Sequence, residues 1–208
     1  MAPTATTSTA AHPPDKRSAI LAAACELMGE ASFGGTPVPA VAARAGVAVG
    51  TIYRYFPGKH ALANALYRDA KRAMQVFLRR ALGDPHVGPA RDGFGRLWRG
   101  LFAFAREQPA AFRFLELHRH QPYLDEASQA LAREVFAEVA EFVRSEQLRG
   151  GIRPGPPELL IALAFGAFVG LMKEAEAGHV PLGEAAIEQA EEAVWRLFQP
   201  THADEEAQ

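Results

Sequence analysis

Residues 36–62 read TPVPAVAARAGVAVGTIYRYFPGKHAL, and this stretch decides the fold of the N-terminal part of the chain. Its apolar residues recur at helical spacing in two short segments, which Gly46 separates. A glycine there allows a tight turn, and Ala45 and Val47 beside it are suited to hold the two segments together. Pro57 and Gly58 end the second segment. The stretch therefore predicts a helix-turn-helix.

The second segment carries side chains that are suited to contact DNA. Gly50 and Thr51, at its start, let the backbone and a small hydroxyl approach another surface closely. Residues 53–55, Tyr-Arg-Tyr, add two phenolic hydroxyls and a guanidinium, which are groups that bind phosphates and base edges. Lys59 opens the following helix, where its ammonium and the helix N-terminus can meet one phosphate together.

Charge is divided unevenly along the 208 residues, although the formal net charge is only -2. Residues 15–80 hold ten Lys or Arg and four Asp or Glu, which gives +6, whereas residues 81–208 hold twelve and twenty, which gives -8. A basic block beside an acidic block indicates one region suited to a polyanion and another that would repel it. Solvated helix faces also produce such a division, so charge favours nucleic-acid binding without deciding it.

Helical spacing continues along the rest of the chain, and no segment alternates apolar and polar residues over the length of a strand. Thr36 is placed to cap the first of the two short helices, with Pro37 in its first turn. We therefore predict an all-α fold. The predicted helices span roughly residues 16–32, 36–45, 49–56, 59–82, 91–107, 109–122, 125–149, 157–177 and 182–198.

Residues 159–172, LLIALAFGAFVGLM, contain no charged or polar side chain. The run is shorter than the ~20 residues that cross a bilayer, so it predicts a helix with partners on both faces. The final helix, apolar on one side and acidic on the other, is its natural neighbour. The pair predicts a homodimer through a four-helix bundle, with the core of the monomer as the alternative. The predicted interface residues are Leu163, Gly166, Ala167, Gly170, Ile187, Ala190 and Val194.

The run AGVAVGTIYRYFPGKHAL, with the helix before it, resembles the DNA-binding domain of the TetR family of bacterial transcriptional regulators. The similarity covers about residues 17–65, and the rest of the chain resembles the family in length and helix layout. The resemblance implies a nine-helix homodimer with an N-terminal three-helix helix-turn-helix domain that binds a palindromic double-stranded DNA operator. It also implies a C-terminal helical domain for ligand binding and dimerisation.

By matching positions of the motif, the resemblance implies which residues of this chain face DNA. They are Thr36, Arg44, Val49, Gly50, Thr51, Tyr53, Arg54, Tyr55 and Lys59. The resemblance implies that the two tyrosines and the lysine contact mainly phosphates. It implies base-edge contacts for Val49, Thr51 and Arg54. Ala48 stands where the family often has a capping Ser or Thr, so the recognition helix lacks a side-chain cap.

The resemblance further implies that the helices after the fourth enclose a cavity, whose occupancy changes the spacing of the two recognition helices. Aromatic and polar side chains there are suited to line it, although core packing explains an aromatic at helical spacing as well. The acidic balance of this region favours a small apolar effector that is neutral or cationic. The predicted lining residues are Trp98, Phe102, Phe114, His118, Tyr123, Phe136, Phe165, Phe168 and Met172, with Glu116 and His120 as further polar candidates.

The predicted organisation is a flexible arm (1–14), a helix-turn-helix domain (15–65), a ligand-binding and dimerisation domain (66–199) and an acidic tail (200–208). Residues 1–14 lack the basic and apolar regions of a secretory signal, which favours a cytoplasmic protein. His118 and His120 point to different sides of a helix, and no metal or catalytic motif occurs, so we expect no metal, no cofactor and no enzyme. An all-α bundle enzyme, or a small-molecule carrier without DNA binding, is the alternative.

Overall fold

The computed structural model describes residues 15–83 and 88–200, and over these residues the chain forms nine helices and no strand. This confirms the predicted all-α fold. The predicted N-terminal arm and, apart from Pro200, the predicted acidic tail lie outside the described residues. The helices are α1 (Lys16–Gly35), α2 (Val38–Arg44), α3 (Val49–Tyr55), α4 (Lys59–Leu82), α5 (Ala90–Glu107), α6 (Pro109–Leu117), α7 (Glu126–Leu148), α8 (Pro157–Glu176) and α9 (Glu184–Trp195).

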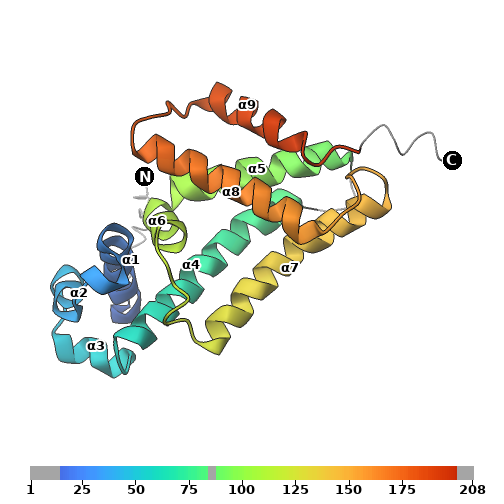
Figure 1. The fold of residues 1–208 in the computed structure, drawn as a ribbon. Helices are drawn as coiled ribbons and strands as arrows, with labels where there is room; N and C mark the ends of the chain where they lie inside the picture. Colours follow the sequence, from blue (N-terminus) through green and yellow to red (C-terminus); the bar gives the residue numbers. More distant parts are fainter. Residues whose placement is uncertain (1–14, 84–87, 201–208) are drawn as a thin grey trace, which may run out of the picture.

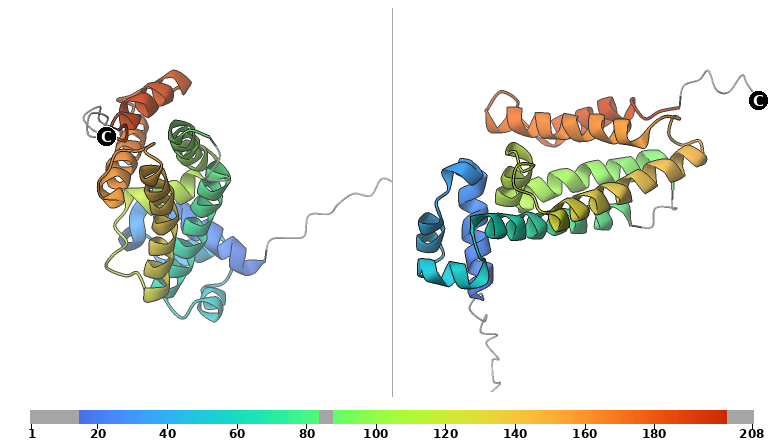
Figure 2. Two further views of the ribbon diagram at one scale, coloured as in Figure 1. Left: turned by 90° about the vertical axis from the view of Figure 1, so that its right-hand side faces the viewer. Right: turned by 60° about the horizontal axis from the view of Figure 1, so that its bottom comes forward.

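The helices form a small head and a larger body (Figure 1). The head consists of α1, α2 and α3, and α4 begins beside them and runs away into the body. In the body, α5 and α7 pack against α4, while α6 packs against α1 and so joins the body to the head. An outer layer is formed by α8 and α9, with α8 on α7 and α9 on α5 (Figure 2).

The turn between α2 and α3 lies at Gly46, whose φ of 64° is in the left-handed region. The Gly46 N–H donates to the carbonyl of Ala43 at 3.2 Å, and the Val47 N–H donates to the carbonyl of Ala42 at 3.0 Å. These two bonds satisfy the last carbonyls of α2 in the arrangement that glycine favours after a helix. Ile52 of α3 is 1% exposed and anchors the helix beneath the turn. The predicted helix-turn-helix geometry is confirmed.

Thr36 does not cap α2, contrary to the prediction. The helix begins at Val38 after Pro37, and no side chain caps it. The Thr36 hydroxyl instead donates toward the carbonyls of Ser32, at 2.8 Å, and Leu27, at 3.1 Å. Its side chain therefore closes the end of α1, where Ser32 interrupts the helix with a φ of 65°.

The helix α6 also differs from its predicted range, because it ends at Leu117 and not near residue 122. His118 adopts an extended backbone, and its Nε2 lies 2.8 Å from the carbonyl oxygen of Gly29 in α1. Gly29 is itself buried against α6, and a Cβ at this position would lie 3.0 Å from the carbonyl oxygen of Ala110. The early end of α6 thus coincides with a close contact between the head and the body.

One hydrophobic core extends from the head to the body, and α4 carries it across. The buried positions of α4 include Leu62, Leu66, Ala70, Met74 and Leu78, which recur at helical spacing on one face. Both parts therefore share this helix and this core.

The outer helix α8 is less buried than its apolar sequence predicts. Within it Leu160 and Phe168 are fully buried, whereas Leu159 is 56% exposed and Leu163 is 47% exposed. The final helix is held to α5 by the Trp98 indole N–H, which donates to the carbonyl of Ile187 at 3.2 Å. Across the described ranges, no helix is both long and apolar enough to cross a membrane.

Candidate nucleic-acid interface and cavities

The exposed face of α3 carries most of the predicted DNA-facing side chains. Tyr53 is 52% exposed, Tyr55 is 42% exposed and Val49 is 36% exposed. Gly50 and Arg54 are exposed as well. Phe56, which follows the helix, is 4% exposed and packs into the head. The helix therefore presents hydroxyl, guanidinium and apolar groups outward on a rigidly held backbone.

The remaining predicted DNA-facing residues differ in their accessibility. Thr51 and Lys59 are half-buried, while Arg44 is exposed and donates to the carboxylate of Glu26 at 2.6 Å. An exposed ion pair of this kind is worth little, so the Arg44 guanidinium is free to exchange partners. Thr36 is the exception, because its side chain is 2% exposed. The hydroxyl of this predicted DNA-facing residue is therefore engaged at the end of α1 and is not presented on the surface.

Lys59 sits at the base of an aromatic stack that reaches into the body. Its ammonium lies 4.6 Å from the ring centroid of Phe33 at the end of α1, and Phe33 stacks on Tyr123 with centroids 4.4 Å apart. The Tyr123 hydroxyl in turn hydrogen-bonds Nδ1 of His120. Burial raises the pKa of Tyr123 to about 12, so this hydroxyl is the donor.

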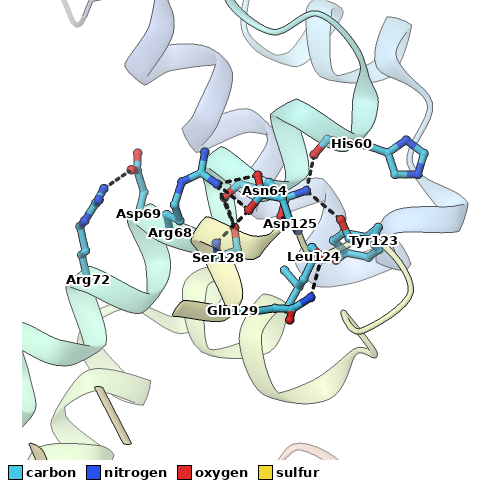
Figure 3. A network of polar contacts seen from close by, with 10 residues as sticks. All are labelled: His60, Asn64, Arg68, Asp69, Arg72, Tyr123, Leu124, Asp125, Ser128 and Gln129. Carbon is cyan, nitrogen blue, oxygen red and sulfur yellow. Dashed lines mark hydrogen bonds and ion pairs between the residues drawn. The ribbon is translucent and has the colours of Figure 1, made fainter. Parts of the chain in front are cut away.

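The predicted ligand residue Tyr123 thus belongs to the contact between head and body. A polar joint lies beside this stack, where α4 meets the start of α7 (Figure 3). The buried Asn64 amide donates to the carbonyls of Tyr123, at 2.8 Å, and His60, at 3.0 Å, and its oxygen accepts from the Asp125 N–H at 2.8 Å. Asp125 caps α7 through Ser128, whose N–H donates to its carboxylate at 2.8 Å.

The Arg68 guanidinium donates to the carboxylate of Asp125 at 2.9 Å and to the hydroxyl of Ser128 at 2.9 Å. Hydrogen bonds from Ser128 and Arg68 lower the pKa of Asp125. The carboxylate therefore stays ionised, and the cap and the joint persist together.

An apolar cavity of about 560 Å³ lies between α4, α5, α7 and α8. This size is within the ~300–1,000 Å³ range of small-molecule sites. Three of the predicted aromatic residues, Trp98, Phe136 and Phe165, lie on its wall, as does Glu116. The wall residues that the sequence did not predict as cavity lining are Lys71, Met74, Leu78, Phe94, Leu97, Leu101, Ala132, Val135, Val139, Phe142, Val143, Ile161, Ala162, Ala164, Gly166, Val169 and Phe198.

Other predicted lining residues do not border the apolar cavity. Phe102 and Phe168 are buried in edge-to-face contact, with ring centroids 5.0 Å apart, and Phe114 packs against His120. Met172 is half-buried and packs against the core. None of these four lies on the wall of the apolar cavity, because helical spacing separates inside from outside but does not locate a void within the inside.

A second, polar cavity of about 480 Å³ adjoins the end of α6 and the segment that follows it. Its wall includes the predicted residue His118, together with Tyr67, Arg119 and Gln121. His120 also borders it, and its Nε2–H donates to the carbonyl of Phe114 at 2.6 Å. Burial lowers the pKa of His120, so the ring is neutral and its Nδ1 accepts from Tyr123.

No group of three or more His, Cys, Asp or Glu side chains within residues 15–83 and 88–200 is arranged to hold a metal ion. The features of the described chain are instead an outward-facing recognition helix behind a tight turn and a large helical body that contains an apolar cavity. They define a helix-turn-helix protein with a larger C-terminal helical body.

The chain belongs to the TetR family. Residues 20–66 match the N-terminal domain of the bacterial regulatory proteins of the tetR family, and residues 71–199 match a tetracyclin repressor-like C-terminal domain. The two matches together cover the head and the body.

Relatives agree with this assignment. The HTH-type transcriptional repressor KstR of Rhodococcus jostii is 46% identical over 59 residues, which is 28% of this chain and 28% of that protein. A TetR-family protein from Vibrio parahaemolyticus has a similar structure, with a TM-score of 0.73 and 28% identity over 88% of this chain and 98% of its own. A TetR-family transcription regulator from Marinobacter aquaeolei has a TM-score of 0.78 and 25% identity over 88% of this chain and 95% of its own.

Proposed function

We propose that the protein is a cytoplasmic transcriptional repressor that binds a palindromic operator as a homodimer and is released by a small-molecule effector. The observation that carries the proposal is the exposed face of α3 behind the Gly46 turn, in a chain of the TetR family. The relative KstR, which is a transcriptional repressor, is similar to this chain over 59 residues.

The contacts follow from the chemistry and the exposure of each side chain. Tyr53 and Tyr55 bring exposed hydroxyls, and Lys59 brings an ammonium at the start of α4, so these three bind phosphates. Arg54 is exposed and suited to a guanine edge, while Val49 is suited to a thymine methyl group.

Thr51 adds a hydroxyl beside these side chains, and Arg44 adds a phosphate contact once it leaves Glu26. Gly50 lets the backbone approach the DNA closely. Thr36 is left out of the proposed contacts, because its side chain is buried.

The homodimer forms through the exposed apolar face of α8. Leu159 and Leu163 lie on this face, and Gly166 and Gly170 continue it at helical spacing. A Cβ added at either glycine would meet open space, so a second helix can approach closely there. An apolar face of this length on a helix without charges over residues 159–172 marks an interface between proteins. A second copy of the chain is the occupant that also brings two recognition helices to one operator.

The predicted interface changes in one respect. Val194 is 7% exposed and belongs to the core of its own subunit, whereas Ile187, Ala190 and Ala167 are half-buried. We therefore assign the centre of the interface to Leu163, Gly166 and Gly170, with Ile187, Ala190 and Ala167 at its margin.

Selection of bound duplexes from a random DNA library tests the proposal. We expect recovery of a palindrome whose half-sites are about one helical turn apart. Arg54→Ala should relax base preference within that palindrome, whereas Tyr55→Ala should weaken binding to all sequences similarly. Arg133→Ala, which removes an exposed arginine of α7, is the matched control for loss of charge. The proposal would be overturned if the recovered sequences were unrelated to one another and bound no more tightly than random DNA.

A further inference from the structure

The apolar cavity and the polar cavity share two residues, Lys71 and Glu116, which line both. Their side chains are 14% and 12% exposed, and Lys71 Nζ lies 3.5 Å from a carboxylate oxygen of Glu116. The ion pair therefore stands at the boundary between a mainly apolar chamber and a polar one. A ligand that passes this boundary has an apolar part on one side and a polar part on the other.

The charges around the polar cavity favour an anion. Lys71 and Arg119 contribute two basic side chains, against the one carboxyl group of Glu116. His120 is neutral, because its Nε2–H donates to Phe114 and its Nδ1 accepts from Tyr123. At 3.5 Å the contact of Lys71 with Glu116 is longer than an ordinary charge-assisted hydrogen bond of ~2.7–2.9 Å. The Lys71 ammonium therefore retains capacity for a better-placed acceptor.

We propose that the effector is an amphiphile with one anionic end, whose apolar body fills the apolar cavity and whose anionic end pairs with Lys71 and Arg119 in the polar cavity. This inference rests on the proposed function and names the chemical class of its effector. It replaces the neutral or cationic effector that the overall charge of the body favoured. That overall charge does not describe the polar cavity, because acidic residues such as Glu138, which pairs with Arg79, lie outside both cavities.

The position of the anionic end also places it beside the contact between head and body. The segment from His118 to Leu124 borders the polar cavity, and the same segment carries Tyr123, which stacks on Phe33. An anion that draws Lys71 and Arg119 together acts on this segment directly.

Calorimetric titration with four dodecyl probes tests the proposal on the purified full chain. Dodecanoate and dodecyl phosphate carry an anionic end, dodecanol a neutral end and dodecylamine a cationic end. We expect at least one of the two anions to bind about tenfold or more tightly than dodecanol, because a hydrogen bond to a charged group is gained. The comparison of the two anions tells a carboxylate-binding site from a phosphate-binding site. Equal affinities for anion and alcohol, tightest binding of the amine, or no binding of any probe would overturn the proposal.

Substitutions at the ion pair distinguish recognition from a merely structural role. Glu116→Gln should raise the affinity for the anion severalfold, because it removes a competing acceptor from Lys71. Lys71→Met should lower that affinity about tenfold and leave the affinity for dodecanol unchanged. Because Lys71→Met leaves a buried carboxylate unpaired, the double variant Lys71→Met/Glu116→Gln repeats the comparison without that charge. Changes in the same direction for both single variants would overturn the proposal.

Arg119→Gln should weaken binding of the anion severalfold, and the exposed Arg133→Gln, outside both cavities, should leave it unchanged. Operator binding by the same preparations is measured separately. Operator binding without binding of any amphiphile removes this inference and leaves the regulator intact. Binding of the anion without operator binding removes the proposed regulator function and leaves the site for the anionic amphiphile intact.

Discussion

We expect the joint between head and body to be most sensitive to mutation of Asn64. It is 3% exposed and makes three hydrogen bonds at 2.8–3.0 Å, two of them to the segment between α6 and α7 (Figure 3). Asn64→Leu keeps the volume and removes all three bonds. The Tyr123 carbonyl and the Asp125 N–H then lose their partner, while the His60 carbonyl remains within α4.

The expected cost follows from those two unpaired groups. A buried polar group without a partner costs about 1–3 kcal/mol, so two of them lower the free energy of unfolding by about 2–4 kcal/mol when water reaches part of the joint. At about 2–4 °C per kcal/mol for a chain of this length, the melting temperature should fall by roughly 5–15 °C.

Urea denaturation followed by circular dichroism measures this effect. The matched control is Gln129→Leu, which removes an exposed hydrogen bond of 3.0 Å to the carbonyl of Leu124 in the same segment. The control should change the free energy of unfolding by about 0.5 kcal/mol or less. If Asn64→Leu and Gln129→Leu proved equally mild, the joint would not hold the head to the body as we describe.

Three further predictions concern the rest of the molecule. Gly29→Ala should lower the free energy of unfolding by about 1–3 kcal/mol in urea denaturation, because its Cβ would lie 3.0 Å from the Ala110 carbonyl oxygen; an unchanged midpoint would contradict the close packing. Burial lowers the pKa of His120, so the stability that its neutral ring contributes is complete above the unfolded pKa of about 6.5 and is lost as pH falls toward the folded pKa. The free energy of unfolding of the His120→Gln variant should therefore depend less on pH than that of the wild type, in urea titrations from about pH 7 to 5. An equal pH dependence in both proteins would count against this. Leu163→Arg should give a monomer by light scattering while Leu148→Arg, at a site 90% exposed, stays dimeric; a dimer in both would exclude the α8 interface.

Local chemistry made the head predictable. The Gly46 turn depends on a backbone conformation that glycine favours, and the exposure of Tyr53 and Arg54 follows from their position opposite Ile52 on one short helix. The role of Thr36 is not predictable in this way, because its hydroxyl reaches the carbonyls of Ser32 and Leu27 only where α1 is interrupted at Ser32. The helix propensity of the residues at the start of α2 does not indicate that α1 is interrupted.

The cavities were less predictable, because they depend on how helices distant in sequence fit together. Periodicity placed Phe102 and Phe168 inside the body, and both are buried, but only the packing of α5 on α8 shows that they fill the core. Lys71 was counted as part of the basic N-terminal block. Its partner Glu116 is 45 residues away, so no local pattern indicates that the two charges meet at a cavity wall.

The central claim is that α3 reads a specific DNA sequence, and equilibrium binding of the selected palindrome against a scrambled duplex tests it most directly. Fluorescence anisotropy at several salt concentrations gives both affinities. We expect the palindrome to bind at least about 10³-fold more tightly than the scrambled duplex at physiological salt, with an affinity that falls steeply as salt rises. Equal affinities for the two duplexes at every salt concentration would contradict the account.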